Sequence, residues 1–410
     1  MRPDPAVCSA PPAHGAGLHV LMVTGAYDPE FSGAGLQCRT LVRGLRDRVS
    51  CRVLTTSLDR SLPRQDCVEG VLVYRVPVDV RRRASRLLAA LSLCRAFVRW
   101  GRACDIVHLH GFSRKSLLVM ALAKLFRKKV LIKLTSAGQD DPEAVRAQSP
   151  WRYRWYRRAD LFVGVSPRLH QLYARARLPS QRFRLIPNGV EVQRFRPAAD
   201  PHEQVALRRM LGLEAQPRWT LCVGFFSREK HPDVLYEAWA KLRAAGRPLG
   251  GLLFIGATQP TYHEIEPALA EAIRRDAQRR GLANDVVFVE RTDRMDAYYR
   301  AVDAFVLASS REGLPNALLE AMASGLPCIA SRIDGVTDPL IQDGVNGVLV
   351  PPVDVGALAE ALDRLFTDPA LAHRLGREAR RTIEARYAMT TVAETYVQVY
   401  RSLVSGAGRL

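Results

Sequence analysis

Short apolar segments alternate with helical stretches through almost the whole of this 410-residue chain, and this alternation constrains the fold more than any other feature. Each apolar segment is the length of a buried strand and is bounded by turn residues. Strands that alternate with helices are typical of a parallel sheet covered on both faces. The predicted strands are residues 19–23, 51–55, 71–74, 105–110, 130–134, 161–165 and 184–187, followed by 219–224, 252–255, 286–289, 304–308, 328–330 and 348–350.

The alternation breaks once, in a Pro-rich, polar stretch at residues 194–201, where we expect a domain boundary. The boundary separates a first domain at residues 18–197 from a second domain at 198–385. We further expect a disordered leader at residues 1–17 and a final helix at 386–410 that crosses back to the first domain. Both domains are expected to be α/β, Rossmann-like and doubly wound. The carboxyl ends of their strands would then face a shared crevice, where ligands of such sheets bind.

Composition is ordinary for a soluble globular protein, with 48% hydrophobic and 25% charged residues. The sequence contains no run of 18 or more apolar residues, so we expect no membrane-spanning helix. The leader also lacks the basic start and apolar core of a signal peptide. The eight cysteines are scattered without a Cys-x-x-Cys pair, which favours reduced thiols over a disulfide framework or a zinc site. We therefore expect a cytoplasmic protein.

The positive charge is concentrated in the first half of the chain. Residues 1–200 carry 35 Lys and Arg against 15 Asp and Glu, whereas the remainder is nearly balanced. A basic half suggests an anionic partner, either a membrane surface, a nucleic acid or an acidic substrate. General enrichment in arginine is the alternative explanation. No recognised nucleic-acid-binding module is present, so we expect no nucleic acid partner.

Two basic segments of the first half could meet a membrane on its inner face. Residues 81–100 form a candidate amphipathic helix on which Leu87, Leu91, Cys94 and Val98 share one face. Such helices can lie on anionic lipid. Residues 151–158 mix Trp and Tyr with Arg, a composition suited to an interface. Alternatively, the first is a core helix with a solvated Arg face, and the aromatic residues of the second pack on the domain edge.

The richest candidate site is residues 311–327, which follow a predicted strand. Pro315 suits the first position of a helix, and the N–H groups at the start of that helix suit a phosphate. Gly313 allows the backbone to approach a ligand closely, while Glu312 and Glu320 bracket the junction. The segment therefore predicts a site for a phosphorylated, hydroxyl-rich ligand, the alternative being a capped surface helix with two solvated glutamates.

Three further segments carry candidate site residues at the ends of predicted strands. Gly33 and Gly35 lie in a Gly-rich turn before a helix expected near Gln37; such a turn can cradle a phosphate or simply be tight. His110 ends a strand where a side chain would point into the crevice, although it could equally be a structural histidine. Arg228 and Lys230 could stabilise a leaving diphosphate, or could belong to a solvated basic loop.

Together these segments make the chain resemble the family 4 glycosyltransferases, the "group 1" retaining transferases of the GT-B fold, from about His19 to Tyr387. The most specific match is Glu312 to Glu320 with residues 321–327 after it. Matching pieces elsewhere are residues 105–110, 165–166, 186–190, 301–304 and 343–350.

The resemblance implies transfer of a sugar from a UDP- or GDP-linked donor to a lipid, polysaccharide or small-molecule hydroxyl, with retention at the anomeric carbon. It also implies no cofactor and no metal. Glu312 would touch the hydroxyls of the donor sugar, Glu320 would bind the ribose, and Lys230 would neutralise the diphosphate. The implied diphosphate-binding backbone N–H groups lie around Gly313, Leu314, Asn316 and Ala317, while Gly33, Gly35 and His110 would lie near the reacting sugar.

The chain departs from the family pattern at two places. Phe225 stands where members usually carry Arg, and we hypothesise that Arg228 supplies the missing charge. Residues 134–138 replace a common His-Gly, which leaves the chemistry on the acceptor side open. We find no second carboxylate placed for a double displacement, so a front-face transfer is favoured. A noncatalytic GT-B protein with a regulatory role is the alternative function.

Overall fold

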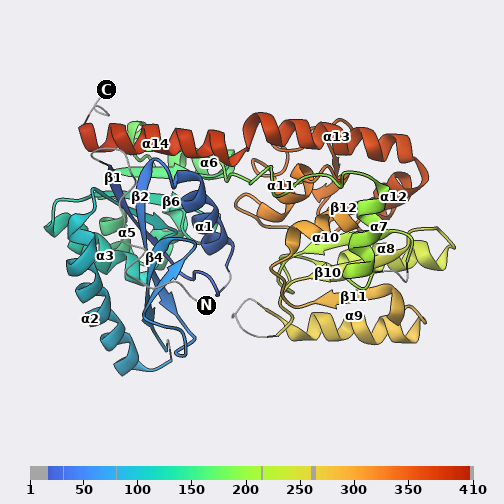
Figure 1. The fold of residues 1–410 in the computed structure, drawn as a ribbon, viewed down its shortest axis with the longest axis horizontal. Helices are drawn as coiled ribbons and strands as arrows, with labels where there is room; N and C mark the ends of the chain where they lie inside the picture. Colours follow the sequence, from blue (N-terminus) through green and yellow to red (C-terminus); the bar gives the residue numbers. More distant parts are fainter. Residues whose placement is uncertain (1–16, 31, 80, 214–215, 260–264, 407–410) are drawn as a thin grey trace. The chain divides into compact units, whose positions relative to one another are not determined.

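The computed structural model describes residues 17–30, 32–79, 81–213, 216–259 and 265–406, and it divides into two α/β units (Figure 1). Unit 1 comprises the chain up to Gly189 together with Met389 onward, and unit 2 runs from Val190 to Ala388. The predicted leader, apart from Gly17, lies outside the described residues. The predicted α/β class with two parallel-sheet domains is confirmed.

Unit 1 contains an eight-stranded sheet in the order β3-β4-β2-β1-β5-β6-β7-β8, which is parallel except where β3 pairs with β4. Every strand predicted for the first half is present. The strands are β1 (Leu18–Thr24), β2 (Val49–Ser57), β3 (Gln65–Val68), β4 (Val71–Pro77), β5 (Ile106–His110), β6 (Lys129–Leu134), β7 (Leu161–Gly164) and β8 (Phe183–Leu185). The helices are α1 (Gly33–Leu45), α2 (Arg83–Trp100), α3 (Arg114–Leu125), α4 (Pro142–Gln148), α5 (Pro150–Tyr156), α6 (Pro167–Arg175) and α14 (Met389–Ser405).

Strand β3 was not predicted, because it is only four residues long, begins with the polar Gln65 and Asp66, and has no buried residue. It exists through a hairpin: Glu69 and Gly70 form a two-residue turn with φ of 53° and 80°, and Val68 pairs with Val71. Left-handed conformations at both turn positions match the twist of an antiparallel pair. The turn, not the apolar pattern, therefore adds this edge strand.

Helix α14 packs on unit 1 although it is the last helix of the chain. Its buried residues Tyr396 and Tyr400 join the same core cluster as Cys38 and Leu41 of α1 and Met22 of β1. Glycines make this close packing possible, because a Cβ added at Gly44 would lie 2.8 Å from Cγ of Met389. Unit 1 is thus completed by chain from both ends of the sequence.

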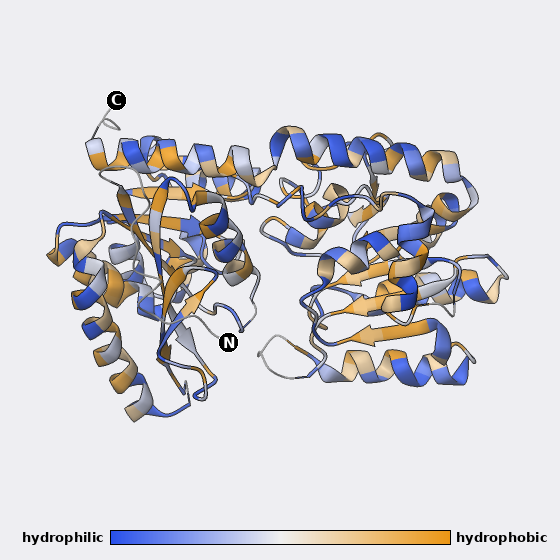
Figure 2. Cartoon of the chain, viewed as in Figure 1, coloured by the Kyte–Doolittle hydropathy of each residue, from blue (hydrophilic) through white to orange (hydrophobic). Residues whose placement is uncertain are grey.

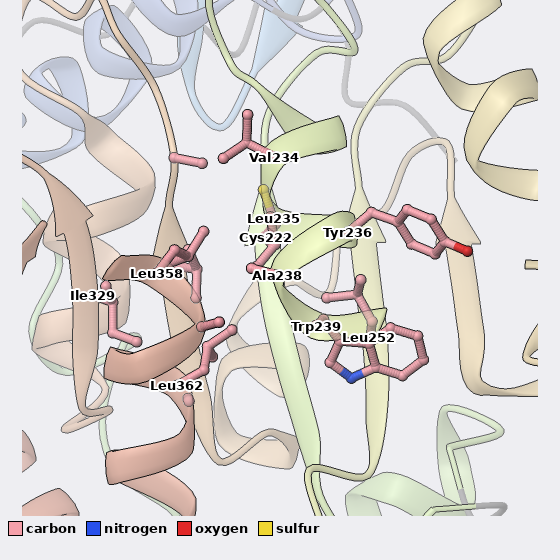
Figure 3. Close-up of a cluster of buried hydrophobic side chains, with 14 of the residues drawn as sticks. Cys222, Val234, Leu235, Tyr236, Ala238, Trp239, Leu252, Ile329, Leu358 and Leu362 are labelled. Atoms are coloured by element: carbon pink, nitrogen blue, oxygen red, sulfur yellow. The ribbon is translucent and has the colours of Figure 1, made fainter. Parts of the chain in front are cut away.

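Unit 2 contains a six-stranded parallel sheet in the order β11-β10-β9-β12-β13-β14, and all its predicted strands are present. Its core packs helices α8 and α12 against the sheet, with Trp239, Leu362 and Ile329 among the buried side chains (Figure 3). The strands are β9 (Trp219–Val223), β10 (Gly251–Ile255), β11 (Val286–Val289), β12 (Ala304–Leu307), β13 (Cys328–Ser331) and β14 (Val348–Val350). The helices are α7 (Pro201–Met210), α8 (Pro232–Ala244), α9 (Pro267–Arg279), α10 (Met295–Ala301), α11 (Asn316–Ala323), α12 (Val355–Thr367) and α13 (Pro369–Arg386).

The chain enters unit 2 before the Pro-rich stretch at which we placed the boundary. Val190 donates its backbone N–H to Tyr387 (2.9 Å), so the entering and leaving segments are paired at one point. Arg380 of α13 then donates to the carbonyl oxygens of Val192 and Phe195 at 2.9 and 2.6 Å. These bonds fix residues 190–197 to unit 2, which a break in the sequence pattern does not reveal.

Apolar residues are concentrated on the strands of both sheets (Figure 2). Helices long and apolar enough to cross a bilayer are not found among the described residues. Cys67 is disulfide-bonded, which contradicts the expectation of reduced thiols throughout, whereas Cys38, Cys51, Cys104, Cys222 and Cys328 are among the free cysteines.

Candidate active site

The loop between β12 and α11 places the acidic segment at the carboxyl end of the unit 2 sheet. Pro315 is the N-cap of α11, with φ −74° and ψ 109°, and its carbonyl accepts the N–H of Leu319 at 3.2 Å. The predicted first helical position is therefore wrong by one residue, because the ψ of Pro315 is still extended. A proline side chain cannot cap the helix, so the partial positive charge of the helix start suits an anion.

Lys230 and Glu312 form an ion pair at this junction. The Nζ of Lys230 donates to Oε1 of Glu312 at 2.5 Å, and both side chains remain partly exposed. The structure therefore brings together the cation and the carboxylate that sequence reasoning assigned to one site. Since β9 and β12 are neighbours in the sheet, the loops after them meet at the same edge.

Additional bonds hold these two loops together, and sequence reasoning missed them. The N–H of Ser310 donates to the carbonyl of Glu229 at 2.8 Å, and the hydroxyl of Ser310 lies 2.9 Å from Nε2 of His231. The carboxylate of Glu229 also pairs with Arg311 at 2.5 Å. Glu229 and His231, on either side of Lys230, thus anchor its loop. The only signal in the sequence for this role is that both residues are adjacent to Lys230.

Glu320 lies on α11 and is partly buried beside Tyr299 of α10. The hydroxyl of Tyr299 is 3.0 Å from Oε2 of Glu320 and 3.2 Å from the carbonyl oxygen of Ala317. Burial raises the pKa of Glu320 to about 7, against the opposing effect of the Tyr299 hydrogen bond. This carboxyl group therefore titrates near neutral pH, and Tyr299 is a site residue that no motif spacing predicted.

The remaining residues proposed around the diphosphate lie in the same turn. Gly313 and Leu314 are buried, whereas Asn316 and Ala317, the first residues of α11, are partly buried. The structure brings all four together with Glu312. Their contact with a diphosphate stays a prediction.

Arg228 pairs with Glu266 and not with the acidic segment after β12. Its Nε donates to Glu266 at 2.9 Å, next to the start of α9, and its side chain is 83% exposed. Exposed pairs of this kind contribute little to stability, so the guanidinium could be recruited by a ligand. Its suggested compensation for Phe225 stays a hypothesis.

In unit 1, Gly33 and Gly35 belong to the first turn of α1 and not to a loop before it. The helix begins at Gly33, earlier than the predicted start near Gln37, because Ser32 caps it by accepting the N–H of Gly35 at 3.0 Å. A Cβ at Gly35 would lie 2.4 Å from the carbonyl oxygen of Ala26. Gly35 is therefore required by this close approach, whatever its role toward a ligand.

His110 ends β5 and is buried, 6% exposed. Its ring stacks on that of His108, with centroids 4.2 Å apart. Burial lowers the pKa of both histidines well below 6.5, and the nearby Lys133 lowers it further. Both rings are accordingly neutral at physiological pH. A cluster of three or more His, Cys, Asp or Glu that could hold a metal is not found among the described residues.

Comparisons with known protein families match both halves of the chain. Residues 204–382 match the model described as "Glycosyl transferases group 1", and residues 31–194 match that described as "Glycosyltransferase Family 4".

Among curated relatives, the chain is 27% identical to the lipopolysaccharide core biosynthesis mannosyltransferase LpsB of Rhizobium meliloti, over 74% of this chain and 81% of that protein. It is 25% identical to the D-inositol 3-phosphate glycosyltransferase of Kribbella flavida, over 91% of each chain.

Two solved structures share the fold over nearly their whole length. Sucrose-phosphate synthase from Thermosynechococcus elongatus superposes with a TM-score of 0.77 at 24% identity, covering 95% of this chain and 100% of its own. Anabaena HepE in complex with UDP and glucose superposes with a TM-score of 0.76 at 18% identity, covering 94% of this chain and 100% of its own.

Proposed function

Because the chain belongs to the group 1 glycosyltransferases and is a transferase of the GT-B fold, we propose that it moves a sugar from a nucleotide diphosphate sugar to an acceptor hydroxyl with retention at the anomeric carbon. The observation that carries this proposal is the Lys230–Glu312 pair beside the start of α11. The structural relative HepE, described with UDP and glucose, further supports a nucleotide-sugar donor, and we propose one that is UDP- or GDP-linked.

In the proposed reaction, the bond between the anomeric carbon and the diphosphate oxygen breaks while the acceptor oxygen bonds to that carbon on the same face. The acceptor proton passes to the leaving diphosphate. The Lys230 ammonium and the N–H groups at the start of α11 stabilise the charge that develops on the diphosphate. Because Glu312 is paired with a cation, its carboxylate is a weak nucleophile, which favours direct transfer over a covalent glycosyl-enzyme.

Release of nucleoside diphosphate by the purified protein tests this proposal. Lys230→Ala and Glu312→Gln should each lower kcat by about tenfold or more, the scale of one lost electrostatic contact to the transition state. Lys241→Ala, an exposed lysine on α8 of the same unit, is the matched control and should behave as wild type. Wild-type rates in Lys230→Ala, or a product with inverted anomeric configuration by NMR, would contradict the mechanism.

The same assay tests whether Arg228 supplies the charge of the arginine that is absent at Phe225. Arg228→Ala should then lower kcat, and a wild-type kcat would contradict this hypothesis.

We also propose that unit 1 meets an anionic membrane surface through α2. The apolar face that was expected either on lipid or in the core is largely exposed: Leu87, Leu91 and Val98 are 69%, 58% and 44% exposed, whereas Ala89 and Phe97 of the same helix are buried. Fourteen Lys and Arg but a single acid, Asp105, occur between residues 80 and 139. Exposed leucines among cations fit anionic lipid, and the acceptor would then be a lipid or a lipid-linked sugar.

Flotation with vesicles containing phosphatidylglycerol, compared with phosphatidylcholine alone, tests this surface. Leu87→Ser with Leu91→Ser should reduce binding severalfold at unchanged thermal stability, since these side chains are already in water. Val205→Ser, at a 53% exposed position on α7 of unit 2, should have no effect. Equal binding to both vesicle types, or no loss on raising the salt concentration, would contradict an electrostatic membrane contact.

A further inference from the structure

Tyr400 of α14, the last helix described, contacts a residue of β5.

 Its hydroxyl lies 2.7 Å from Nδ1 of His108, and both side chains are fully buried. The ring of Tyr396, one turn earlier on α14, lies 5.5 Å from the ring of His108. Helix α14 therefore holds the His108 ring by one hydrogen bond and by aromatic contact.

His108 in turn limits the orientation of His110. The two residues are two positions apart on β5, so their side chains share one face of the sheet, and their rings stack with an interplanar angle of 21°. Both ring nitrogens of His110 lack a hydrogen-bond partner in the described part of the chain. With no hydrogen bond to fix it, the His110 ring is oriented by its backbone and by the His108 ring.

The surroundings of this pair keep His110 neutral. Lys133 of β6 is the register partner of His110, is buried, and has its Nζ 5.9 Å from the ring centre of Tyr396. Burial lowers the pKa of Lys133 to about 8, with Cys38 of α1 acting in the opposite direction. The charged groups that shift the pKa values of the two histidines are Lys133 and, for His110, also His108; no carboxylate is among them. A neutral imidazole keeps one donor and one acceptor nitrogen, and in His110 both are buried with no partner in the described part of the chain.

We propose that Tyr400 is a positioning residue for His110 and acts through His108. The proposal rests on the glycosyl transfer proposed above and on the prediction, implied by the family resemblance, that His110 lies near the reacting sugar. Tyr400 fixes the His108 ring, and the stacked His108 ring fixes His110, whose two ring nitrogens are buried and have no hydrogen-bond partner among the described residues. In this way α14 contributes to the reaction chemistry as well as to the core of unit 1.

The two buried tyrosines of α14 provide a matched pair of variants. Tyr400→Phe removes the hydroxyl bonded to His108, whereas Tyr396→Phe removes a hydroxyl that has no partner among the described residues. Tyr400→Phe should lower kcat by about tenfold, the equivalent of roughly 1.4 kcal/mol for one buried hydrogen bond, with an unchanged KM for the donor. Tyr396→Phe should retain wild-type kcat.

A double variant separates positioning from a general loss of stability. His110→Ala should lower kcat at least as much as Tyr400→Phe, and Tyr400→Phe should cause no further loss in the His110→Ala background, because residues that act as a unit are not additive. Multiplied losses in the double variant would overturn the proposal, as would wild-type kcat in Tyr400→Phe.

The histidine ring signals in NMR test the same contact without turnover. The chain has nine histidines, so His108 and His110 can be assigned with single substitutions. Tyr400→Phe should shift the signals of both rings, and Tyr396→Phe should leave them nearly unchanged. Unchanged His110 signals in Tyr400→Phe would overturn the proposal. A wild-type protein that releases no nucleotide would instead count against the proposed function, while these signals would still decide the contact.

Discussion

Glu320, which we expect to bind the donor, has a carboxyl group with a raised pKa. It lies inside α11, receives the Tyr299 hydroxyl, and has a pKa raised by burial to about 7 from its ordinary 4.5. A residue expected to accept ribose hydroxyls is therefore only partly ionised at neutral pH. If Glu320 binds the ribose as predicted, its protonation will influence how tightly a nucleotide binds.

Nucleotide affinity should accordingly depend on pH through Glu320. The carboxylate accepts hydroxyl hydrogen bonds and the protonated form does so less well, so Kd should rise as pH falls below about 7, by up to roughly tenfold per pH unit. Titration calorimetry with UDP and GDP from pH 6 to 8 measures this. Because phosphate groups titrate in the same range, the decisive quantity is the difference from Glu320→Gln, in which this dependence should disappear. Parallel profiles in the two proteins would show that Glu320 does not meet the ligand.

The raised pKa of Glu320 also determines how its contribution to folding stability changes with pH. The folded protein keeps the Glu320 proton up to about pH 7, whereas the unfolded chain releases it near pH 4.5. The contribution of Glu320 to stability is therefore fully present below about pH 4.5 and is lost as pH rises through 7.

Among the elements, α1 and α14 meet at an unusually close contact. Gly44 of α1 faces Met389, and Gly189 approaches the same methionine, with an added Cβ 2.6 Å from its Cε. Met389 is thus seated between two positions that admit no side chain. The contact between the first and last helices of unit 1 depends on these glycines.

A side chain at Gly44 should loosen this contact. Gly44→Val forces Met389 to move, and overpacking of this kind costs about 1–3 kcal/mol, which should lower the melting temperature by several degrees. Gly25→Val is the matched control, because a Cβ at Gly25 meets no atom within 4 Å. Differential scanning fluorimetry compares the two. Combining Gly44→Val with Met389→Ala should restore part of the loss, and equal melting temperatures for the two glycine variants would contradict this account of the packing.

At the scale of the whole molecule, the two units differ in how the chain builds them. Unit 2 is one continuous segment, Val190–Ala388, whereas unit 1 needs the segment from Met389 onward to complete its core. Without α14, apolar side chains of α1 and β1 would lose the partners that bury them. The two units should therefore respond differently to separation.

Expressed alone, residues 190–388 should be soluble and unfold cooperatively, because their core is complete. Residues 17–189 should be unstable or aggregate, and fusion of residues 389–406 through a flexible linker should restore a folded unit 1. Circular dichroism during thermal unfolding and size-exclusion chromatography distinguish these outcomes. A stably folded 17–189 fragment would contradict the structural role given to α14.

The fold class, nearly all the strands and the loop-to-helix junction around Glu312 and Glu320 could be predicted from the sequence, because they depend on local apolar patterns and on residues close together in the chain. The sequence could not predict β3, which depends on a turn, or the Tyr299–Glu320 contact, which joins two helices. The exposure of Leu87 and Leu91 was equally undecided, since periodicity identifies an apolar face but not what covers it. Tertiary structure decided these points, and it also brought Tyr400 to His108, because contacts across 292 positions of sequence exist only once the last helix packs on the first sheet.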